Sequence, residues 1–226
     1  MNENEKNFNS FIIKACEFLK QDIKAYHSLQ YTKKGNPGNP DWIVDFKDDD
    51  SKYSFDSDVI VKARNKGCSY VLNCLAHFCY EYKKNKENFV VCVVPRAKPY
   101  KPKHFKDFIQ YVIGRIQERD YGGRIIDGTD YIKRIRETRT THFTEKSDGG
   151  LDPYPGITKD TCDIFEEGIK GRNVLLVDDI YTHHHGNKLV GVDEDCLQAL
   201  LDCGAKRVEF YALAKTRQKD LDEILF

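Results

Sequence analysis

Two short apolar runs that lack hydrophobic–polar alternation constrain the fold of this chain most strongly. Residues 89–94 read FVVCVV and residues 174–177 read VLLV, so both consist of β-branched and other apolar side chains. A strand of this composition is buried on both faces, which is typical of a parallel sheet covered by helices. The two runs therefore predict the centre of a parallel sheet.

Helical and strand-like segments alternate around these two runs. Apolar side chains recur at helical spacing in residues 5–26, 68–84, 104–119 and 193–203. We also expect helices over 158–170 and 217–225, and short strands over 41–46, 58–63, 123–128 and 206–213. Strands that alternate with helices indicate an α/β fold, with a mostly parallel sheet flanked by helices in a Rossmann-like three-layer arrangement.

Length and charge exclude several classes of protein. The chain has 226 residues, enough for one large α/β domain. Its 36 basic residues balance 36 acidic ones, which argues against general binding to nucleic acid or to a membrane surface. No apolar run reaches the ~20 residues of a membrane span, and the acidic N-terminus does not resemble a secretory signal. We expect a single cytoplasmic domain over residues 1–226.

Two adjacent carboxylates, Asp178 and Asp179, directly follow the second apolar run. Ligands of α/β sheets bind beyond the carboxyl ends of the strands, where two carboxylates can accept hydrogen bonds from the hydroxyls of a ribose. A receiver domain of a response regulator also has paired acids after a strand, but that strand begins the domain, whereas few residues follow Asp179 here. A solvated pair of acids without a ligand is the remaining alternative.

Three segments resemble the type I phosphoribosyltransferase superfamily. VLLVDDIYT (174–182) resembles its signature for phosphoribosyl pyrophosphate, and CVVPRAK (92–98) resembles the pyrophosphate-binding loop of ComF-like and amidophosphoribosyltransferase-like members. RIRETRTTHFTEK (134–146) resembles the start of their mobile loop. The resemblance covers residues 89–216, and residues 1–60 form an N-terminal extension of unassigned role.

The resemblance implies three groups of ligand-binding residues and a loop that closes over them. Asp178 and Asp179 would bind the ribose, and Arg96 and Lys98 would bind the pyrophosphate. The loop after the acids would bind the 5′-phosphate through Thr182, His183, Gly186 and Gly191. The arginines of the mobile loop that would close over the ligand are Arg134, Arg136 and Arg139.

The loop after Thr182 departs from the family pattern. It is longer than usual and carries three consecutive histidines, for which we find no partner cluster that would make a protein-bound metal site. The acids Asp193, Glu194 and Asp195 suit the first turn of a helix but would oppose a phosphate bound there.

By resemblance, we expect phosphoribosyl pyrophosphate as the small-molecule substrate, together with Mg²⁺. The protein would transfer the phosphoribosyl group to an unidentified nitrogen acceptor and release pyrophosphate. Two alternatives stay open: a catalytically inactive nucleotide- or phosphoribosyl-binding regulatory protein, and a ComF-like accessory factor in DNA uptake or processing. We expect no membrane or nucleic-acid partner, and a homodimer is compatible with the sequence.

Overall fold

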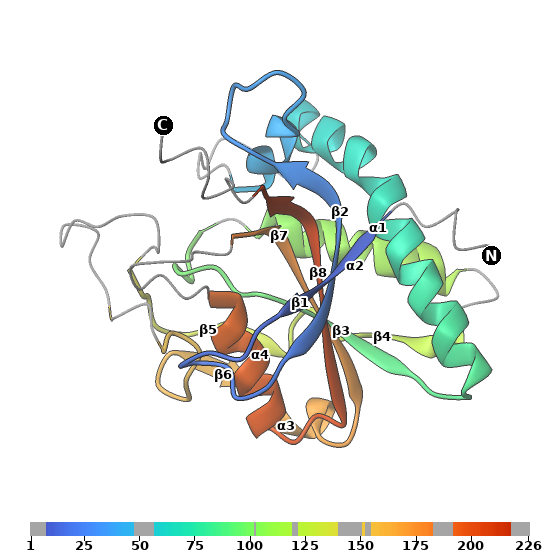
Figure 1. Ribbon diagram of the computed structural model, residues 1–226, viewed down its shortest axis with the longest axis vertical. Helices are drawn as coiled ribbons and strands as arrows, with labels where there is room; N and C mark the ends of the chain where they lie inside the picture. The colour runs from blue at the N-terminus through green and yellow to red at the C-terminus, as the bar shows by residue number, and fades with distance from the viewer. Residues whose placement is uncertain are drawn as a thin grey trace, which may run out of the picture.

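The computed structural model describes residues 8–47, 57–101, 103–118, 122–139, 151, 155–182 and 192–217. A six-stranded sheet in the order β1-β2-β8-β7-β3-β4 forms its centre (Figure 1). The strands are β1 (Asn9–Ile13), β2 (Ile23–Tyr31), β3 (Phe89–Val93), β4 (Ile125–Asp127), β7 (Asn173–Tyr181) and β8 (Arg207–Thr216). β1 is antiparallel to β2, and the other neighbouring strands are parallel.

Helices cover both faces of this sheet. One face carries α1 (Asp58–Lys84), α2 (His104–Gln117) and the 3-10 helix η2 (Asp41–Lys47), and the other carries α3 (Glu166–Ile169) and α4 (Val192–Asp202). A separate antiparallel pair of strands, β5 (Ile132–Arg134) and β6 (Cys162–Ile164), packs on the α4 side, and the short helix η3 (Gly122–Arg124) precedes β4. The predicted α/β fold with a mostly parallel, helix-flanked sheet is confirmed.

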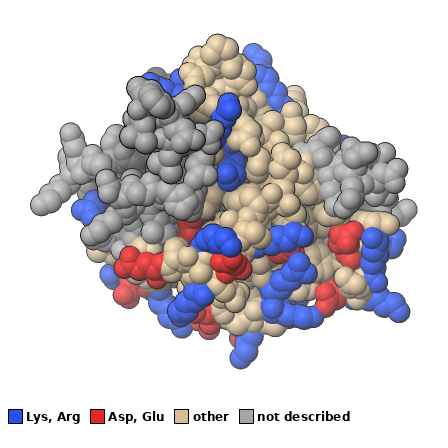
Figure 2. All heavy atoms as spheres, in the orientation of Figure 1, with Lys and Arg blue, Asp and Glu red and all other residues tan. Residues whose placement is uncertain are grey.

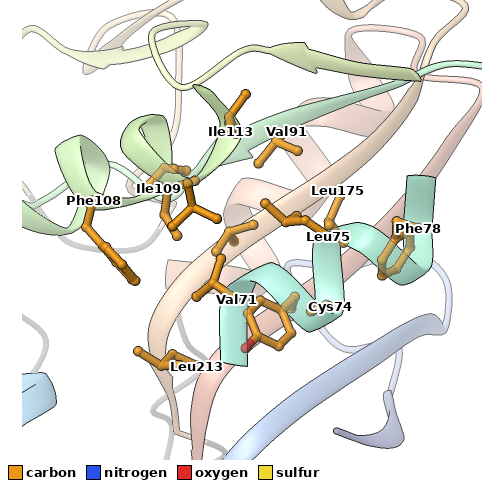
Figure 3. Packing of buried hydrophobic residues seen from close by; sticks show 14 of the residues in the cluster. Val71, Cys74, Leu75, Phe78, Val91, Phe108, Ile109, Ile113, Leu175 and Leu213 are labelled. Carbon is orange, nitrogen blue, oxygen red and sulfur yellow. The ribbon is translucent and has the colours of Figure 1, made fainter. Parts of the chain in front are cut away.

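The two hydrophobic cores use alternate residues of the same central strands. Val91 and Leu175 belong to the cluster under α1 and α2, whereas Val90 and Leu176 belong to the cluster under α4. Figure 3 shows the first cluster, in which α1 side chains such as Leu75 approach those of α2 and of the strands. Burying each large apolar side chain contributes roughly 1.5–3 kcal/mol, so strands that are apolar on both faces hold all three layers together.

The predicted helix over residues 5–26 is wrong, because β1 and the start of β2 occupy this range. β2 pairs with β8, with Ala25 opposite Phe210 and Tyr26 opposite Tyr211. The pairing extends the sheet and buries Ala25 and Tyr26, so tertiary contact overrides the local helical periodicity.

The predicted strands over 41–46 and 58–63 are also wrong. Residues 41–46 lie in η2, and residues 58–63 form the first turns of α1. Ser57 caps α1 and its hydroxyl oxygen accepts a hydrogen bond from the Ile60 N–H (3.4 Å), which satisfies one of the free donors of the first turn. Residues 158–170 contain β6 and the four-residue α3 in place of one helix. The predicted helix over 217–225 lies, apart from Arg217, outside the described residues.

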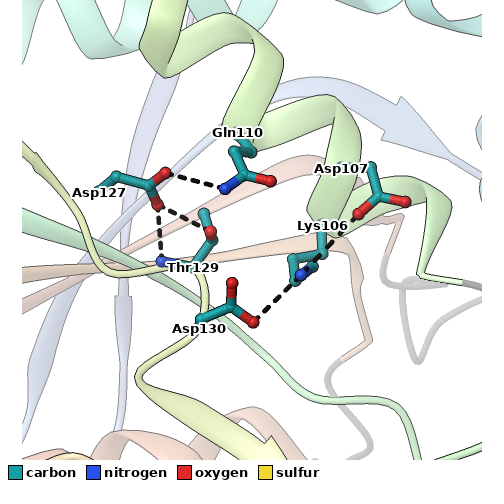
Figure 4. A network of polar contacts seen from close by, with 6 residues as sticks. All are labelled: Lys106, Asp107, Gln110, Asp127, Thr129 and Asp130. Carbon is teal, nitrogen blue, oxygen red and sulfur yellow. Dashed lines mark hydrogen bonds and ion pairs between the residues drawn. The ribbon is translucent and has the colours of Figure 1, made fainter.

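Polar contacts fix α2 against the turn that follows β4 (Figure 4). Asp127 Oδ1 accepts hydrogen bonds from the backbone N–H (2.9 Å) and the hydroxyl (2.7 Å) of Thr129. Gln110 of α2 donates to the other oxygen of Asp127 at 3.2 Å. Lys106 of α2 forms an ion pair with Asp130 at 3.2 Å. These contacts position the carboxyl end of β4 beside β3.

Candidate functional site

The strand order reverses between β3 and β7. From β3 the chain goes to β4 on one side, and it then continues through β5, β6 and α3 to β7 on the other side of β3. In open α/β sheets, the connections that leave two such strands diverge and form the usual ligand crevice at their carboxyl ends. The structure therefore provides a candidate site beyond the ends of β3 and β7.

The predicted acids and the predicted pyrophosphate loop meet at this point. The Val94 N–H donates to the Val177 carbonyl oxygen at 3.0 Å, so the ends of β3 and β7 lie side by side. Asp178 is the next residue after Val177, and Arg96 lies two residues beyond Val94. The two segments are thus brought together from separate parts of the chain.

The alternation of β7 between the two faces of the sheet is interrupted at the acids. Val177 packs in the α1 cluster and so does Ile180, three residues later, whereas Tyr181 packs in the α4 cluster. A regular strand would place Val177 and Ile180 on opposite faces.

Asp179 is 5% exposed, and its Oδ1 accepts a hydrogen bond from the backbone N–H of Ile180 at 2.6 Å. Asp178 is half-buried. The hydrogen bond from the neighbouring backbone N–H fixes the orientation of the Asp179 carboxylate. A carboxylate with a fixed orientation is well placed to accept a hydrogen bond from a ligand hydroxyl.

Helix α4 starts with three buried acids. Asp193, Glu194 and Asp195 are between 3% and 6% exposed. Burial, then the negative charges of Asp178 and Glu194, raise the pKa of Asp193 well above the ordinary aspartate value. A hydrogen bond with the Asp178 carboxyl group raises it further. Asp193 Oδ1 has no hydrogen-bond partner among the described residues. The protonated form of Asp193 is therefore favoured, and its proton can join the two carboxyl groups.

Glu194 connects the start of α4 to the end of β7. The Tyr181 hydroxyl donates a hydrogen bond to Glu194 Oε1 at 2.8 Å, and the Tyr181 side chain is 1% exposed. Burial and the Glu194 carboxylate raise the pKa of Tyr181 above the ordinary tyrosine value. Tyr181 therefore stays a hydrogen-bond donor over the physiological range and holds the start of α4 against the end of β7.

Asp195 and Arg134 link α4 to the loop after β3. Asp195 Oδ2 accepts hydrogen bonds from the backbone N–H groups of Gly156 and Ile157, the latter at 2.8 Å. Arg134 donates to the carbonyl oxygen of Gly156, and its Nε donates to the carbonyl oxygen of Arg96 at 3.1 Å. One buried guanidinium thus joins the candidate pyrophosphate loop to the segment held by Asp195.

The three arginines assigned to the mobile loop lie in strand β5 and in the segment directly after it. Arg134 lies in strand β5 and is 8% exposed, because its guanidinium forms the internal hydrogen bonds just described. Arg136 is exposed. The Arg139 backbone N–H donates to the Leu151 carbonyl oxygen at 2.9 Å, beside the bridge between Thr138 and Leu151.

The loop after β3 packs against the segment that follows β5. Lys98 is 7% exposed and its Nζ lies 3.6 Å from Glu137 Oε2. The Thr138 backbone N–H donates to the Ala97 carbonyl oxygen at 2.9 Å. Arg96 is half-buried. Neither Glu137 nor Thr138 stood out in the sequence, because their role is to contact a loop that is distant along the chain.

The candidate 5′-phosphate residues fall mostly outside the part of the chain that the structure describes. Thr182 is half-buried directly after β7. His183, Gly186 and Gly191 lie in the range 183–191, which is not among the described residues. In the described ranges, no group of three or more His, Cys, Asp or Glu side chains could hold a metal ion by itself.

The site combines acidic and basic sides. Asp178 and Asp179 lie at the end of β7 with Asp193 beside them at the start of α4, while Arg96 and Lys98 follow β3. Chemically, the acidic side can accept hydrogen bonds from hydroxyl groups and the basic side can bind an anion. A ligand with hydroxyls at one end and a multiply charged anion at the other matches this arrangement.

A comparison with protein-family models found no matching model, and a comparison with curated proteins found no match. Among the described helices, none has both the length and the apolar content needed to cross a membrane. The class that fold and site define is thus an α/β protein with a candidate ligand site at its topological switch point.

Proposed function

We propose that the crevice between β3 and β7 binds phosphoribosyl pyrophosphate, and that the protein transfers the phosphoribosyl group to a nitrogen acceptor with release of pyrophosphate. One observation carries this proposal: Asp178 and Asp179 lie at the carboxyl end of β7, and Arg96 follows the neighbouring β3. These are the two segments whose sequences resemble the ribose and pyrophosphate sites of type I phosphoribosyltransferases.

In this proposal the two sides of the crevice have separate roles. Asp178 and Asp179 accept hydrogen bonds from the ribose hydroxyls, while Arg96 and Lys98 neutralise the pyrophosphate. The nitrogen acceptor forms a bond to the anomeric carbon as the bond from that carbon to the pyrophosphate oxygen breaks. Charge then accumulates on the leaving group and a cation-like ribose forms, so oriented charges of both signs stabilise the transition state.

Mg²⁺ fits this proposal as a companion of the ligand. It usually binds through one or two carboxylates together with phosphate oxygens and water, and it does not need a cage built only from protein. Asp178 or Asp179 can supply the carboxylate, and the bound ion would neutralise part of the pyrophosphate charge.

A second candidate function, ligand binding without transfer, is favoured by the acids of α4. A helix N-terminus is the usual place for a phosphate in such sheets. Here that N-terminus carries Asp193, Glu194 and Asp195, all buried, and Asp193 contacts Asp178. Negative charge at this position opposes a 5′-phosphate and so weakens the geometry that transfer needs.

Calorimetry and a turnover assay separate the candidates. The purified chain is titrated with phosphoribosyl pyrophosphate with and without Mg²⁺, and pyrophosphate release is followed with ammonia and with purine and pyrimidine bases as acceptors. Mg²⁺-dependent binding with turnover supports the transferase, and binding without turnover supports the second candidate. Absence of binding under both conditions contradicts both.

A further inference from the structure

A second hollow lies at the opposite end of the central strands from the crevice. It has a volume of about 230 Å³ and is formed where β3, β7 and β8 begin. Its apolar lining comes from Val90 of β3 and Ile126 of β4. Its polar lining comes from Glu87, Asn88, Arg172, Asn173 and Lys206.

Hydrogen bonds and an ion pair hold the polar side of this hollow in place. Asn173 is 5% exposed, and its Nδ2 donates to the Asn88 carbonyl oxygen at 3.1 Å and to Glu87 Oε2 at 3.3 Å. Lys206 forms an ion pair with the same Glu87 carboxylate. Arg124 donates to Asn88 Oδ1 at 3.3 Å. The polar groups are therefore pre-positioned, as in sites that bind small molecules.

Positive charge exceeds negative charge around the hollow. The lining contains two cations, Arg172 and Lys206, and one carboxylate, that of Glu87, while Arg124 contacts Asn88 from outside the lining. The Arg172 guanidinium is exposed and has no hydrogen bond or ion pair within the described ranges of the chain. Figure 2 shows Lys and Arg side chains interspersed with Asp and Glu side chains in the lower half of the molecule, the end at which α3 and the starts of β7 and β8 lie in Figure 1. An arginine without a protein partner beside a polar hollow can bind an anion by a two-pronged hydrogen bond.

We propose that this hollow is a second ligand site, which binds a small phosphate monoester or carboxylate with a short apolar body. Arg172 binds the anionic group with support from Lys206, and the apolar body lies on the partly exposed Ile126, because Val90 lines the hollow but is fully buried. The volume of about 230 Å³ suits a single ring, since a cavity of about 150 Å³ can bind benzene. The proposal is independent of the function proposed for the crevice.

Phenyl phosphate and inorganic phosphate test this site by NMR titration of the ¹⁵N-labelled full chain. The side-chain amide signals of Asn88 and Asn173 report on the hollow directly. We expect saturable shifts of both signals with phenyl phosphate, and weaker binding of inorganic phosphate because it has no apolar part. Arg172→Ala should weaken the binding of phenyl phosphate by about tenfold, because it removes charged hydrogen bonds to the anionic group.

Lys170→Ala provides the matched control, because Lys170 is a neighbouring exposed cation outside the lining. It should bind phenyl phosphate as the wild type does. If Arg172→Ala and Lys170→Ala lost equal affinity for phenyl phosphate, the arginine would act only through the general electrostatic field, and the proposed site would be wrong. The site would also be wrong if the Asn88 and Asn173 side-chain amide signals did not shift at millimolar phenyl phosphate.

Ile126→Phe fills the apolar part of the hollow. It should lower the affinity for phenyl phosphate to that for inorganic phosphate. An unchanged affinity would contradict the placement of the apolar body on Ile126.

Discussion

The carboxyl group of Asp193, in the first turn of α4, is hydrogen-bonded to the carboxyl group of Asp178, at the end of β7. Two ionised carboxylates in contact would repel each other, so this contact, together with burial, favours the protonated form of Asp193. The pair joins the two ends of the segment in which a phosphoribosyltransferase would bind the 5′-phosphate. It therefore affects both the stability of the fold and the charge of the candidate site.

The Asp193 carboxyl group predicts a characteristic pH dependence of stability. Its pKa in the folded protein is raised well above 3.8, chiefly by burial, so the folded state binds this proton more tightly than the unfolded state. The contribution of this group to the free energy of unfolding is full below the unfolded pKa and decreases as pH rises above it. Asp193→Asn keeps a hydrogen-bond donor and has no such proton to lose.

We therefore expect Asp193→Asn to be more stable than the wild type at pH 7, by about 1 kcal/mol or more, the free energy of one pKa unit. The difference should shrink as the pH falls towards 4. Urea denaturation between pH 4 and pH 8 measures it, with Asp163→Asn as a control at an exposed aspartate of β6. Parallel pH profiles for wild type and Asp193→Asn would contradict the buried, protonated state.

The ribose assignment predicts that Asp178→Asn and Asp179→Asn each weaken binding of phosphoribosyl pyrophosphate by about tenfold or more, because each removes a charged hydrogen-bond acceptor. The midpoint of thermal unfolding should stay nearly unchanged in Asp178→Asn, because the amide oxygen of asparagine can still accept a hydrogen bond from the protonated Asp193. Calorimetry and thermal melts measure the two effects. A double variant that binds as tightly as the wild type would exclude the ribose role.

The pyrophosphate assignment predicts a selective effect of Arg96→Ala. Affinity for pyrophosphate should fall, while affinity for ribose 5-phosphate should stay nearly unchanged, because only the first ligand carries the group that Arg96 neutralises. Lys101→Ala, in the same loop, serves as the control and should alter neither affinity. Equal losses for both ligands in Arg96→Ala would mean that the residue acts only through the general field of the protein.

Arg134 should matter for stability and not only for ligand affinity. Arg134→Ala leaves the Arg96 carbonyl oxygen without its buried donor and removes one of two donors to the Gly156 carbonyl oxygen, which also accepts from the Thr161 hydroxyl at 2.6 Å. Such losses cost about 1–3 kcal/mol for each buried group, so we expect a large fall in the free energy of unfolding. Arg136→Ala, two residues later and exposed, should change it by less than about 0.5 kcal/mol. Similar values for both variants would refute the linking role of Arg134.

Two glycines should respond in opposite ways to replacement by alanine. A Cβ at Gly128 would lie 2.3 Å from Val90 Cγ1 and 3.1 Å from the Val91 carbonyl oxygen, so Gly128→Ala should destabilise the contact between β3 and the turn after β4. At Gly114, within α2, a Cβ would meet nothing within 4 Å. Gly114→Ala should stabilise the protein by about 0.5–1 kcal/mol. Thermal unfolding distinguishes the two, and a stabilising Gly128→Ala would contradict the close approach.

The sequence alone determined the central elements of the fold. Strands β3 and β7 and helices α2 and α4 lie where the apolar patterns predicted them, within a few residues. A run that is apolar on every side must be buried whatever its partners are, so local composition is sufficient for such segments. The same reasoning identified the end of β7 as a candidate site, because two carboxylates directly follow a buried apolar run.

Only the tertiary structure decided the N-terminal strands and the contacts around the acids. β2 is a strand because β8 offers it hydrogen bonds from the other end of the chain, and no local pattern contains that information. In the same way, the acids of α4 look like ordinary helix-start residues until the packing of α4 on β7 buries Asp193 against Asp178. Periodicity tells which side of an element is apolar, but it does not tell which element will cover that side.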